Sequence, residues 1–333
     1  MRRYSKILCV LAVIFLMAAA PVFSQSSISD LTAGVNSFSG KMAQSLPFYS
    51  TIGLNWSDAY IGQLISAPPH FGFGLTAGAV IVDAGAMRPL MSSLGYSGFG
   101  NIPMGLPLPA YTAEVRLGGI ILPFDAGLKF GYLDTSKIDF INSALGGMSI
   151  DYLLVGADIR YAVLDSKVLP IKLSVGFGVN YLKGGVSTTL PTGPYNFSFG
   201  GNTLNATSPN VGLRWETTTF ELKTQVSFPL FIITPYVGAG VSYSMSKAGY
   251  EVKSNITVNG GPISQTHINQ LHSLGVTGVN ANGFESMINS SDWNMRLYGG
   301  LSFNLAVIKI DITGMYNLFD SAYGGTVGVR FQL

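Results

Sequence analysis

Strict alternation of apolar and polar residues is the feature that most constrains the fold of this sequence. From Ile171 to Tyr181 every odd position is apolar, and every even position is polar or glycine. Because successive side chains of a β-strand point to opposite faces, this stretch predicts a strand with one apolar and one polar face. Eight further stretches show the same pattern: 71–81, 111–117, 124–132, 153–163, 235–245, 293–303, 308–312 and 323–333.

One more stretch, residues 211–228, alternates with a change of phase. Apolar residues occupy odd positions before Thr217 and even positions after Thr219. An extra residue in one strand shifts the pattern in this way. The sequence therefore predicts a β-bulge between these two threonines.

The composition excludes most alternatives to a membrane barrel. Charged residues make up 11% of the chain and hydrophobic residues 47%, with a net charge of +2. A disordered chain or a nucleic-acid-binding protein would need a much stronger charge signal. After residue 24 no apolar run approaches the roughly 20 residues of a transmembrane helix. An apolar chain rich in glycine and aromatic residues, with so many alternating strands, fits a transmembrane β-barrel better than a soluble β-sandwich.

The connections between strands predict their number and orientation. In bacterial barrels the periplasmic turns are short and the external loops are long. We therefore predict an all-β fold, a transmembrane antiparallel β-barrel of about 10 strands (alternatively about 12), whose first strand begins and whose last strand ends on the periplasmic side. The short connections are 120–123, 164–169, 230–232 and 305–307, and they alternate with long ones at 83–108, 134–147, 183–210 and 247–292 and a short external one at 319–321.

The first 24 residues have the plan of a secretory signal peptide. Basic residues precede an apolar stretch from Ile7 to Ala20, and the small residues Val22 and Ser24 fit cleavage before Gln25. The predicted division is a signal peptide at 1–24, an N-terminal amphipathic helix and plug segment at 25–69, and the barrel at 70–333. The only cysteine, Cys9, falls in the signal peptide, so no disulfide is expected in the mature chain.

The final strand resembles the C-terminal strand of outer-membrane barrels. Phe331 and Val329 share one face with Leu333, and Arg330 and Gln332 lie on the other. The terminal residue of that group is usually phenylalanine, whereas here it is leucine. The resemblance implies that the barrel-assembly machinery recognises this strand and inserts the protein into the lipid of the cell outer membrane.

Charged residues fall on the polar faces of the strands and predict the content of the lumen. Opposite charges often stand two positions apart, so we expect a ladder of ion pairs lining a narrow lumen. A selective constriction would need one sign of charge to dominate. The residues are Glu114, Arg116, Asp125, Lys129, Asp158, Arg160, Lys172, Glu221, Lys223, Arg296, Lys309, Asp311 and Arg330.

Glycine also recurs at inward positions, where the missing side chain leaves room for something bulky to lie against the wall. We expect a helix over residues 27–46 to fill that room as a plug, with Ser27 or Ser29 as N-cap and Pro47 as its end. The alternative position is the periplasmic membrane surface. The apolar face of this helix, which recurs at the helical spacing, includes Leu31, Val35, Phe38 and Met42.

The stretch from Asn55 to His70 follows this helix. It ends in Pro68-Pro69-His70 and leads into a glycine-rich strand. This region is similar to the N-terminal part of an uncharacterised family of outer-membrane β-barrels from diderm bacteria, spirochaetes among them. The resemblance implies an outer-membrane barrel and carries no activity with it.

Patterns typical of catalysis or metal binding are poor in this sequence. Barrel enzymes need a histidine with a serine or aspartate partner, but His70 is at the periplasmic entry and His267 and His272 share one external loop. We therefore expect no enzymatic activity, no metal and no cofactor.

The external loops carry the remaining functional signal. Residues 83–108 are too apolar for a solvated loop, and methionine-rich surfaces adapt to varied hydrophobic ligands. A short helix is expected near residues 263–274, over the mouth of the barrel. The two loops could equally pack on each other as a structural cap. The candidate ligand-binding residues are Met87, Leu90, Met91, Leu94 and Phe99.

Two functions remain open. The first is a channel or transporter for small hydrophobic molecules with a plug-gated lumen, which resembles the fatty-acid-transporter type of barrel with fewer strands. The alternative is a structural or adhesive surface protein with a closed lumen and binding loops.

Overall fold

The computed structural model describes residues 25–66, 69–82, 106–137, 148–166, 170–189, 195–273, 279–280 and 283–333. The predicted signal peptide and the five candidate residues of the 83–108 loop lie outside these ranges.

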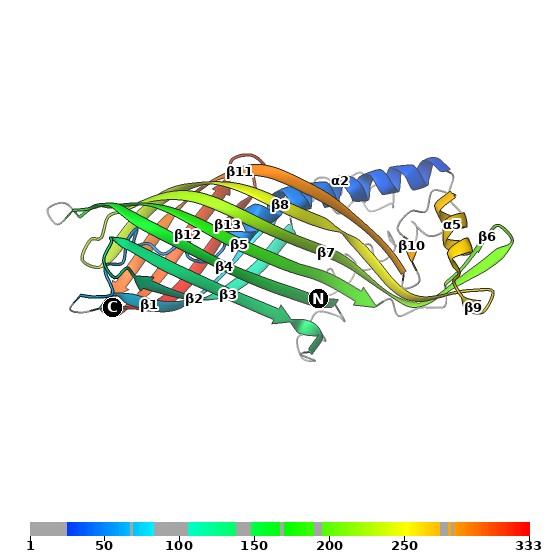
Figure 1. Cartoon of the computed structure of the whole chain (residues 1–333), viewed down its shortest axis with the longest axis horizontal. Coiled ribbons are helices and arrows are strands. Elements are labelled where there is room, and N and C mark those ends of the chain that lie inside the picture. The colour runs from blue at the N-terminus through cyan, green and yellow to red at the C-terminus, as the bar shows by residue number, and fades with distance from the viewer. Residues whose placement is uncertain are drawn as a thin grey trace.

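An antiparallel barrel of 10 strands forms the body of the molecule (Figure 1). Neighbouring strands pair in chain order, β8 pairs with β11, and β13 pairs with β1 to close the barrel. This confirms the predicted fold and strand number. The barrel strands are β1 (Phe71–Val82), β2 (Leu106–Gly118), β3 (Phe124–Asp134), β4 (Met148–Asp165), β5 (Lys172–Thr189), β7 (Asn202–Ser227), β8 (Ile233–Val258), β11 (Gly283–Leu305), β12 (Ile308–Asn317) and β13 (Tyr323–Gln332).

The remaining elements are not part of the barrel wall. Helix α2 (Gln25–Ser50) precedes the barrel, and α5 (Gln265–Ser273) lies in the predicted loop over the mouth. In the described ranges no helix combines the length and apolarity that a membrane span requires. The others are β6 (Tyr195–Phe199), β9 (Gly261–Pro262), β10 (Val279–Asn280) and the short η3 (Thr135–Lys137).

Side chains alternate between an exposed apolar outer face and a buried inner face. On β3 the burial pattern alternates residue by residue, and on β5 the outward Phe177 is 43% exposed. Tyr243 and Trp293 contact each other on the outer face with tilted rings and centroids 5.3 Å apart, as expected of aromatic residues at a membrane interface. The outer face is therefore the lipid-facing surface of a transmembrane barrel.

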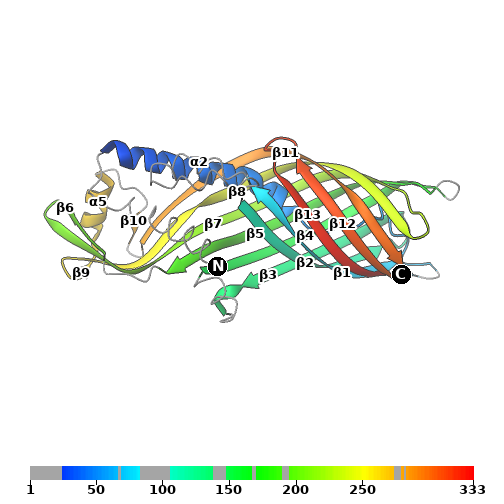
Figure 2. The same cartoon turned by 180° about the vertical axis from the view of Figure 1, so that it is seen from behind.

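The two ends of the barrel differ. The short turns and Leu333 lie at one end, which we call the short-turn end, and the long connections lie at the other, the long-loop end (Figures 1 and 2). At the long-loop end β7 and β8, of 26 residues each, and β11, of 23, continue far beyond the 10 residues of β12 and β13. A strand needs only about 9–11 residues to cross a bilayer. The surplus forms an extended wall outside the membrane.

The predicted bulge in β7 is wrong. The register of β7 against β5 runs without a shift through Thr217 and Thr219. Both threonines point inward, as do Trp215 and Glu221. The apolar residues move from the outward to the inward face of the strand because the strand leaves the membrane. The outward positions become polar in water, while the inward Trp215 joins an apolar core. The register shift in β7 against β8 lies between Thr207 and Asn210.

The assignment of outward and inward side chains can be tested on β5. Replacing the outward Phe177 by arginine should cost about 2–4 kcal/mol, because the charge would lie in lipid near the membrane midplane. Thr189→Arg, on the same strand but beyond the membrane, is the control and should leave stability nearly unchanged. Heat-modifiable mobility on gels measures the folded fraction. Equal folded fractions of the two variants would contradict the assignment of Phe177 to the lipid-facing side.

Candidate functional site: a filled lumen

Helix α2 enters the barrel from the long-loop end (Figures 1 and 2). Met42, Ala43 and every residue from Ser45 to Ser50 are buried, and the helix packs against β7, β8 and β11. Residues 51–61, which we call the lumen segment, follow it and are all buried. The chain then reaches the short-turn end, where Leu64 N donates to Gly119 O at 2.9 Å.

The structure differs from the predicted plug at residues 27–46. The barrel holds residues 42–61, and the side chains of Leu31, Val35 and Phe38 lie outside the described part of α2. The helix also continues through Pro47 to Ser50. Side-chain hydroxyls hold this last turn, since Ser50 Oγ donates to Pro47 O at 2.7 Å and Thr51 Oγ1 donates to Phe48 O at 2.7 Å.

The outer part of the lumen is apolar. One cluster joins the end of α2 to inward side chains of the wall, and Tyr49 donates its hydroxyl to Pro109 O at 2.6 Å. Burying this many apolar side chains stabilises the helix inside the barrel, at roughly 1.5–3 kcal/mol for each large one. The helix contributes Met42, Ala43, Leu46, Phe48 and Tyr49, and the wall contributes Val80, Leu108, Tyr152, Leu154, Leu182, Trp215 and Met315.

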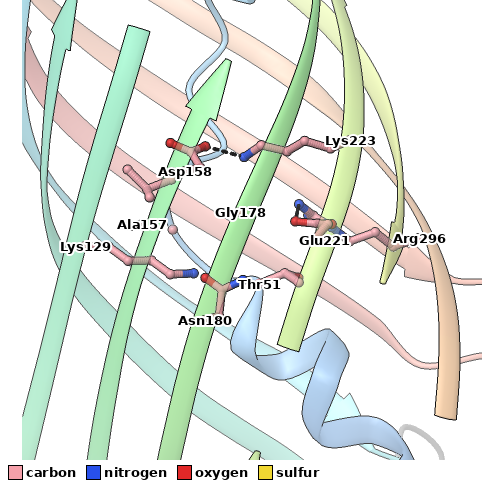
Figure 3. Close-up of a pocket in the computed structure, with 11 residues that line it drawn as sticks. Thr51, Lys129, Ala157, Asp158, Gly178, Asn180, Glu221, Lys223 and Arg296 are labelled. Atoms are coloured by element: carbon pink, nitrogen blue, oxygen red, sulfur yellow. Dashed lines mark hydrogen bonds and ion pairs between the residues drawn. The ribbon is translucent and has the colours of Figure 1, made fainter. Parts of the chain in front are cut away.

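A lysine binds the C-terminal end of α2. Lys129 Nζ donates to Ser50 O at 2.8 Å and to Ile52 O at 2.6 Å. A cation is favoured there because the helix dipole leaves partial negative charge on the last carbonyls. The chain then turns through Gly53 at φ +86°, where a Cβ would stand 2.6 Å from Thr112 Oγ1. Only glycine fits this turn. Figure 3 shows Lys129 reaching toward the end of the helix.

Trp56 is the central side chain of the lumen segment. Its ring lies between two guanidinium groups, with the Cζ atoms of Arg116 and Arg330 at 5.6 and 4.7 Å from the ring centroid. Its Nε1 donates to Glu114 Oε2 at 2.6 Å. The ring also lies against Gly72, where a Cβ would come within 2.9 Å of it. The missing side chain at this inward glycine therefore makes room for the lumen segment.

Asp58 is held by side chains from opposite parts of the wall. Its Oδ2 lies 2.7 Å from Lys309 Nζ and 3.0 Å from Arg330 Nη2. Arg160 Nη1 donates to the Asp58 carbonyl at 2.7 Å. Gln225 donates to the two preceding carbonyls, those of Trp56 and Ser57. The segment is thus fixed by its backbone as well as by its side chains.

Buried ion pairs connect the strands beneath these contacts. Asp125 accepts from both Arg116 and Arg160, and Asp158 pairs with Arg116 and with Lys223 at 2.6 Å. Asp125 also accepts from the backbone N–H of Ile61 at 3.1 Å. Because desolvated charges must be paired to be tolerated, each of these groups depends on the others.

All 13 charged residues named from the sequence lie on the inner face of the barrel. Eleven are buried, whereas Lys172 and Lys309 are partly exposed. Their eight cations exceed their five anions by three, and Asp58 of the lumen segment adds one anion. Backbone carbonyls at the end of α2 and in the lumen segment accept hydrogen bonds from cations, as when Lys172 Nζ donates to Tyr60 O at 3.1 Å.

The sequence reading missed Asn55, Trp56 and Asp58 as partners of the lumen charges. Asn55 Oδ1 accepts from Arg296 Nη2 at 3.1 Å, and Arg296 also pairs with Glu221 at 2.6 Å. Two features of the sequence could have predicted these partners: the excess of positive charge on the inward faces, and the polar residues just before the first strand.

Small cavities lie between the segment and the wall. Two of them hold about 10 Å³ each, which is about the space that one water molecule needs. One of them is lined by Lys129, Asp158, Glu221 and Lys223, and Figure 3 shows Lys223 reaching Asp158 past Gly178 of the strand between them.

Outside the membrane, ion pairs join the outer faces of the extended strands. Arg214 contacts Asp151 and Glu251, and it reaches across Gly185, where a Cβ would collide with it. Burial alone would raise the pKa of the Glu251 carboxyl, but hydrogen bonds from Arg214 and Lys253 outweigh burial and hold the pKa below its ordinary value. The Glu251 carboxyl therefore stays ionised at any pH above the ordinary pKa range of glutamate. Its stabilising pairs with Arg214 and Lys253 are lost only when the pH falls below that range and the carboxyl is protonated.

The three histidines are not among the side chains that hold the lumen segment. His70 is at the short-turn end, with Nδ1 3.2 Å from Leu333 O, and His267 and His272 are in α5. Within the described ranges, no group of three or more His, Cys, Asp or Glu residues could hold a metal ion.

Comparison with known proteins gives one family match. The sequence model of a family described as Lsa36-like matches residues 100–333. No curated protein matches this chain.

Several solved structures resemble the fold at low identity. The translocator domain of autotransporter NalP from Neisseria meningitidis is 12% identical, with 90% of this chain and 98% of that chain covered and a TM-score of 0.38. A major outer membrane protein from Thermus thermophilus is 12% identical, with 79% and 99% covered and a TM-score of 0.33. The outer membrane protease OmpT from Escherichia coli is 9% identical, with 80% and 97% covered and a TM-score of 0.38.

Proposed function

This chain belongs to the Lsa36-like family, and we propose that it is an outer-membrane barrel with a closed lumen that binds other macromolecules through its long-loop end. The observation that carries the proposal is the lumen segment. Buried side chains hold it from Ser50 to Ile61, and the cavities beside it admit about one water molecule each.

The extended wall supports the second half of the proposal. It bears its own small core, in which Leu204, Ile256 and Val258 of the long strands pack on Leu271 of α5. Such a rigid scaffold positions loops for binding.

The closed lumen is tested by conductance. The intact protein in a planar bilayer is expected to be nearly silent, because the lumen segment lies in the bore with all of its residues buried. Conductance typical of an open porin would contradict the proposal.

Binding is tested with cells that express the protein, applied to an array of immobilised proteins and polysaccharides. Leu271→Asp should weaken retention of the cells, because it places a charge in the small core between α5 and the extended wall. Gln270→Asp, at an exposed position of the same helix, is the matched control and should retain binding. Equal retention of cells with and without the protein would reject the binding function.

Transport of small hydrophobic molecules is the second candidate. The observation that favours it is the apolar outer part of the lumen, which would offer an apolar surface if α2 moved out. Uptake of a hydrophobic dye or fatty acid by cells with and without the protein separates the two functions. Uptake that depends on the protein would favour transport.

A further inference from the structure

The course of the chain through the barrel has a topological consequence. Residues 63–66 lie at the short-turn end, where Gln63 bridges to Gly119. The lumen segment occupies the bore, and α2 continues from it to the long-loop end. Going from β1 toward the N-terminus, the chain therefore passes from one side of the membrane to the other inside its own barrel.

The first half of α2 lies well outside the bore. About 14 residues separate Gln25 from Ser39, the first buried residue among the described side chains of α2, and a helix rises 1.5 Å per residue, so these residues span about 21 Å. Figures 1 and 2 show this part beside the extended wall of β8 and β11, at the end away from Leu333. Ser37 on this helix is exposed.

The ends of the barrel can be oriented by their connections. Bacterial barrels have short turns on the periplasmic side and long loops outside the cell. The turns 228–232 and 306–307 are at the short-turn end, which is therefore periplasmic. The start of α2 is at the opposite end.

We infer that the barrel carries its own N-terminal segment across the membrane and displays the first half of α2 on the cell surface. The chemistry of the segment suits this passage. Five serines, two glycines and one alanine are among the 17 residues from Gln25 to Lys41, and these small side chains fit a narrow bore. The inference does not depend on the proposed binding function, because it concerns only which side of the membrane each residue reaches.

Cysteine labelling tests the inference. Cys9, in the predicted signal peptide, is the only cysteine of the chain, so single cysteines can be introduced at exposed serines. Ser37→Cys and Ser66→Cys lie on either side of the lumen segment, and Ser273→Cys in α5 reports the long-loop end. A membrane-impermeant maleimide should label Ser37→Cys and Ser273→Cys in intact cells, but Ser66→Cys only after the outer membrane is permeabilised.

A second measurement covers the case in which a cysteine disturbs the helix. An epitope inserted between Gln25 and Ser26 should bind its antibody on intact cells, with heat-modifiable mobility confirming that the barrel is folded. Labelling or antibody binding that requires permeabilisation, or that fails even then, overturns the inference. Loss of binding to the array with surface labelling intact would reject only the proposed function.

Discussion

Replacing Asp125 by alanine is expected to lower the free energy of unfolding by about 3–5 kcal/mol. The carboxylate is fully buried and pairs with both Arg116 and Arg160, which are buried as well. Its removal leaves two desolvated cations short of a partner and frees the N–H of Ile61. Unfolding of the purified barrel in denaturant, followed by tryptophan fluorescence, measures the loss.

Asp134 on the same strand is the matched control. Its pair with Lys137 lies at the exposed end of β3, where the lysine side chain is 72% exposed. Solvent-exposed pairs contribute only about 0–1 kcal/mol, so Asp134→Ala should change stability little. Similar losses in the two variants would mean that the charges of the lumen are not coupled as the contacts indicate.

Trp56→Ala is expected to open the lumen. It removes the ring between Arg116 and Arg330 and leaves the Glu114 carboxylate without its indole donor. Truncation of a buried tryptophan costs about 3–5 kcal/mol, and the vacated volume lies directly in the bore. The variant should conduct ions in a planar bilayer, in contrast to the intact protein.

Trp293→Ala controls for the loss of a tryptophan as such. Trp293 is 64% exposed on the outer face, so its removal leaves the lumen segment intact and should give no conductance. A silent Trp56→Ala variant with a correctly folded barrel would show that the segment blocks the bore without this side chain.

The sequence predicted the barrel well, because each membrane strand has two constant environments. Outward residues such as Phe177 meet lipid, and inward residues such as Arg160 meet the lumen, so alternation survives along the whole crossing. Turn lengths then gave the strand number. Beyond the membrane this rule ends, and the prediction took the outer parts of β7 and β8 for loops.

The contents of the lumen were harder to predict, because they depend on contacts between residues far apart in the chain. Asn55, Trp56 and Asp58 follow no helical or strand period. Asp58 pairs with Lys309 and Arg330, which are more than 250 residues away. Likewise, the helical spacing of apolar residues predicted that α2 exists. Only its packing against the wall determines that the helix continues through Pro47 and that its last turns lie inside the barrel.

The position of Trp56 has a consequence for the order of assembly. Its ring contacts Arg330 on β13, lies against Gly72 on β1 and contacts Arg116 on β2, so it spans the seam where the first and last strands of the barrel pair. A strand pair between chain ends is the slowest to form, because its loop-closure entropy is largest. Since Trp56 lies close before Phe71, the first residue of β1, it moves with that strand and offers β13 a docking point from within. We therefore expect the lumen segment to act as an internal template for barrel closure, so that the bore is filled in the same step that seals the wall.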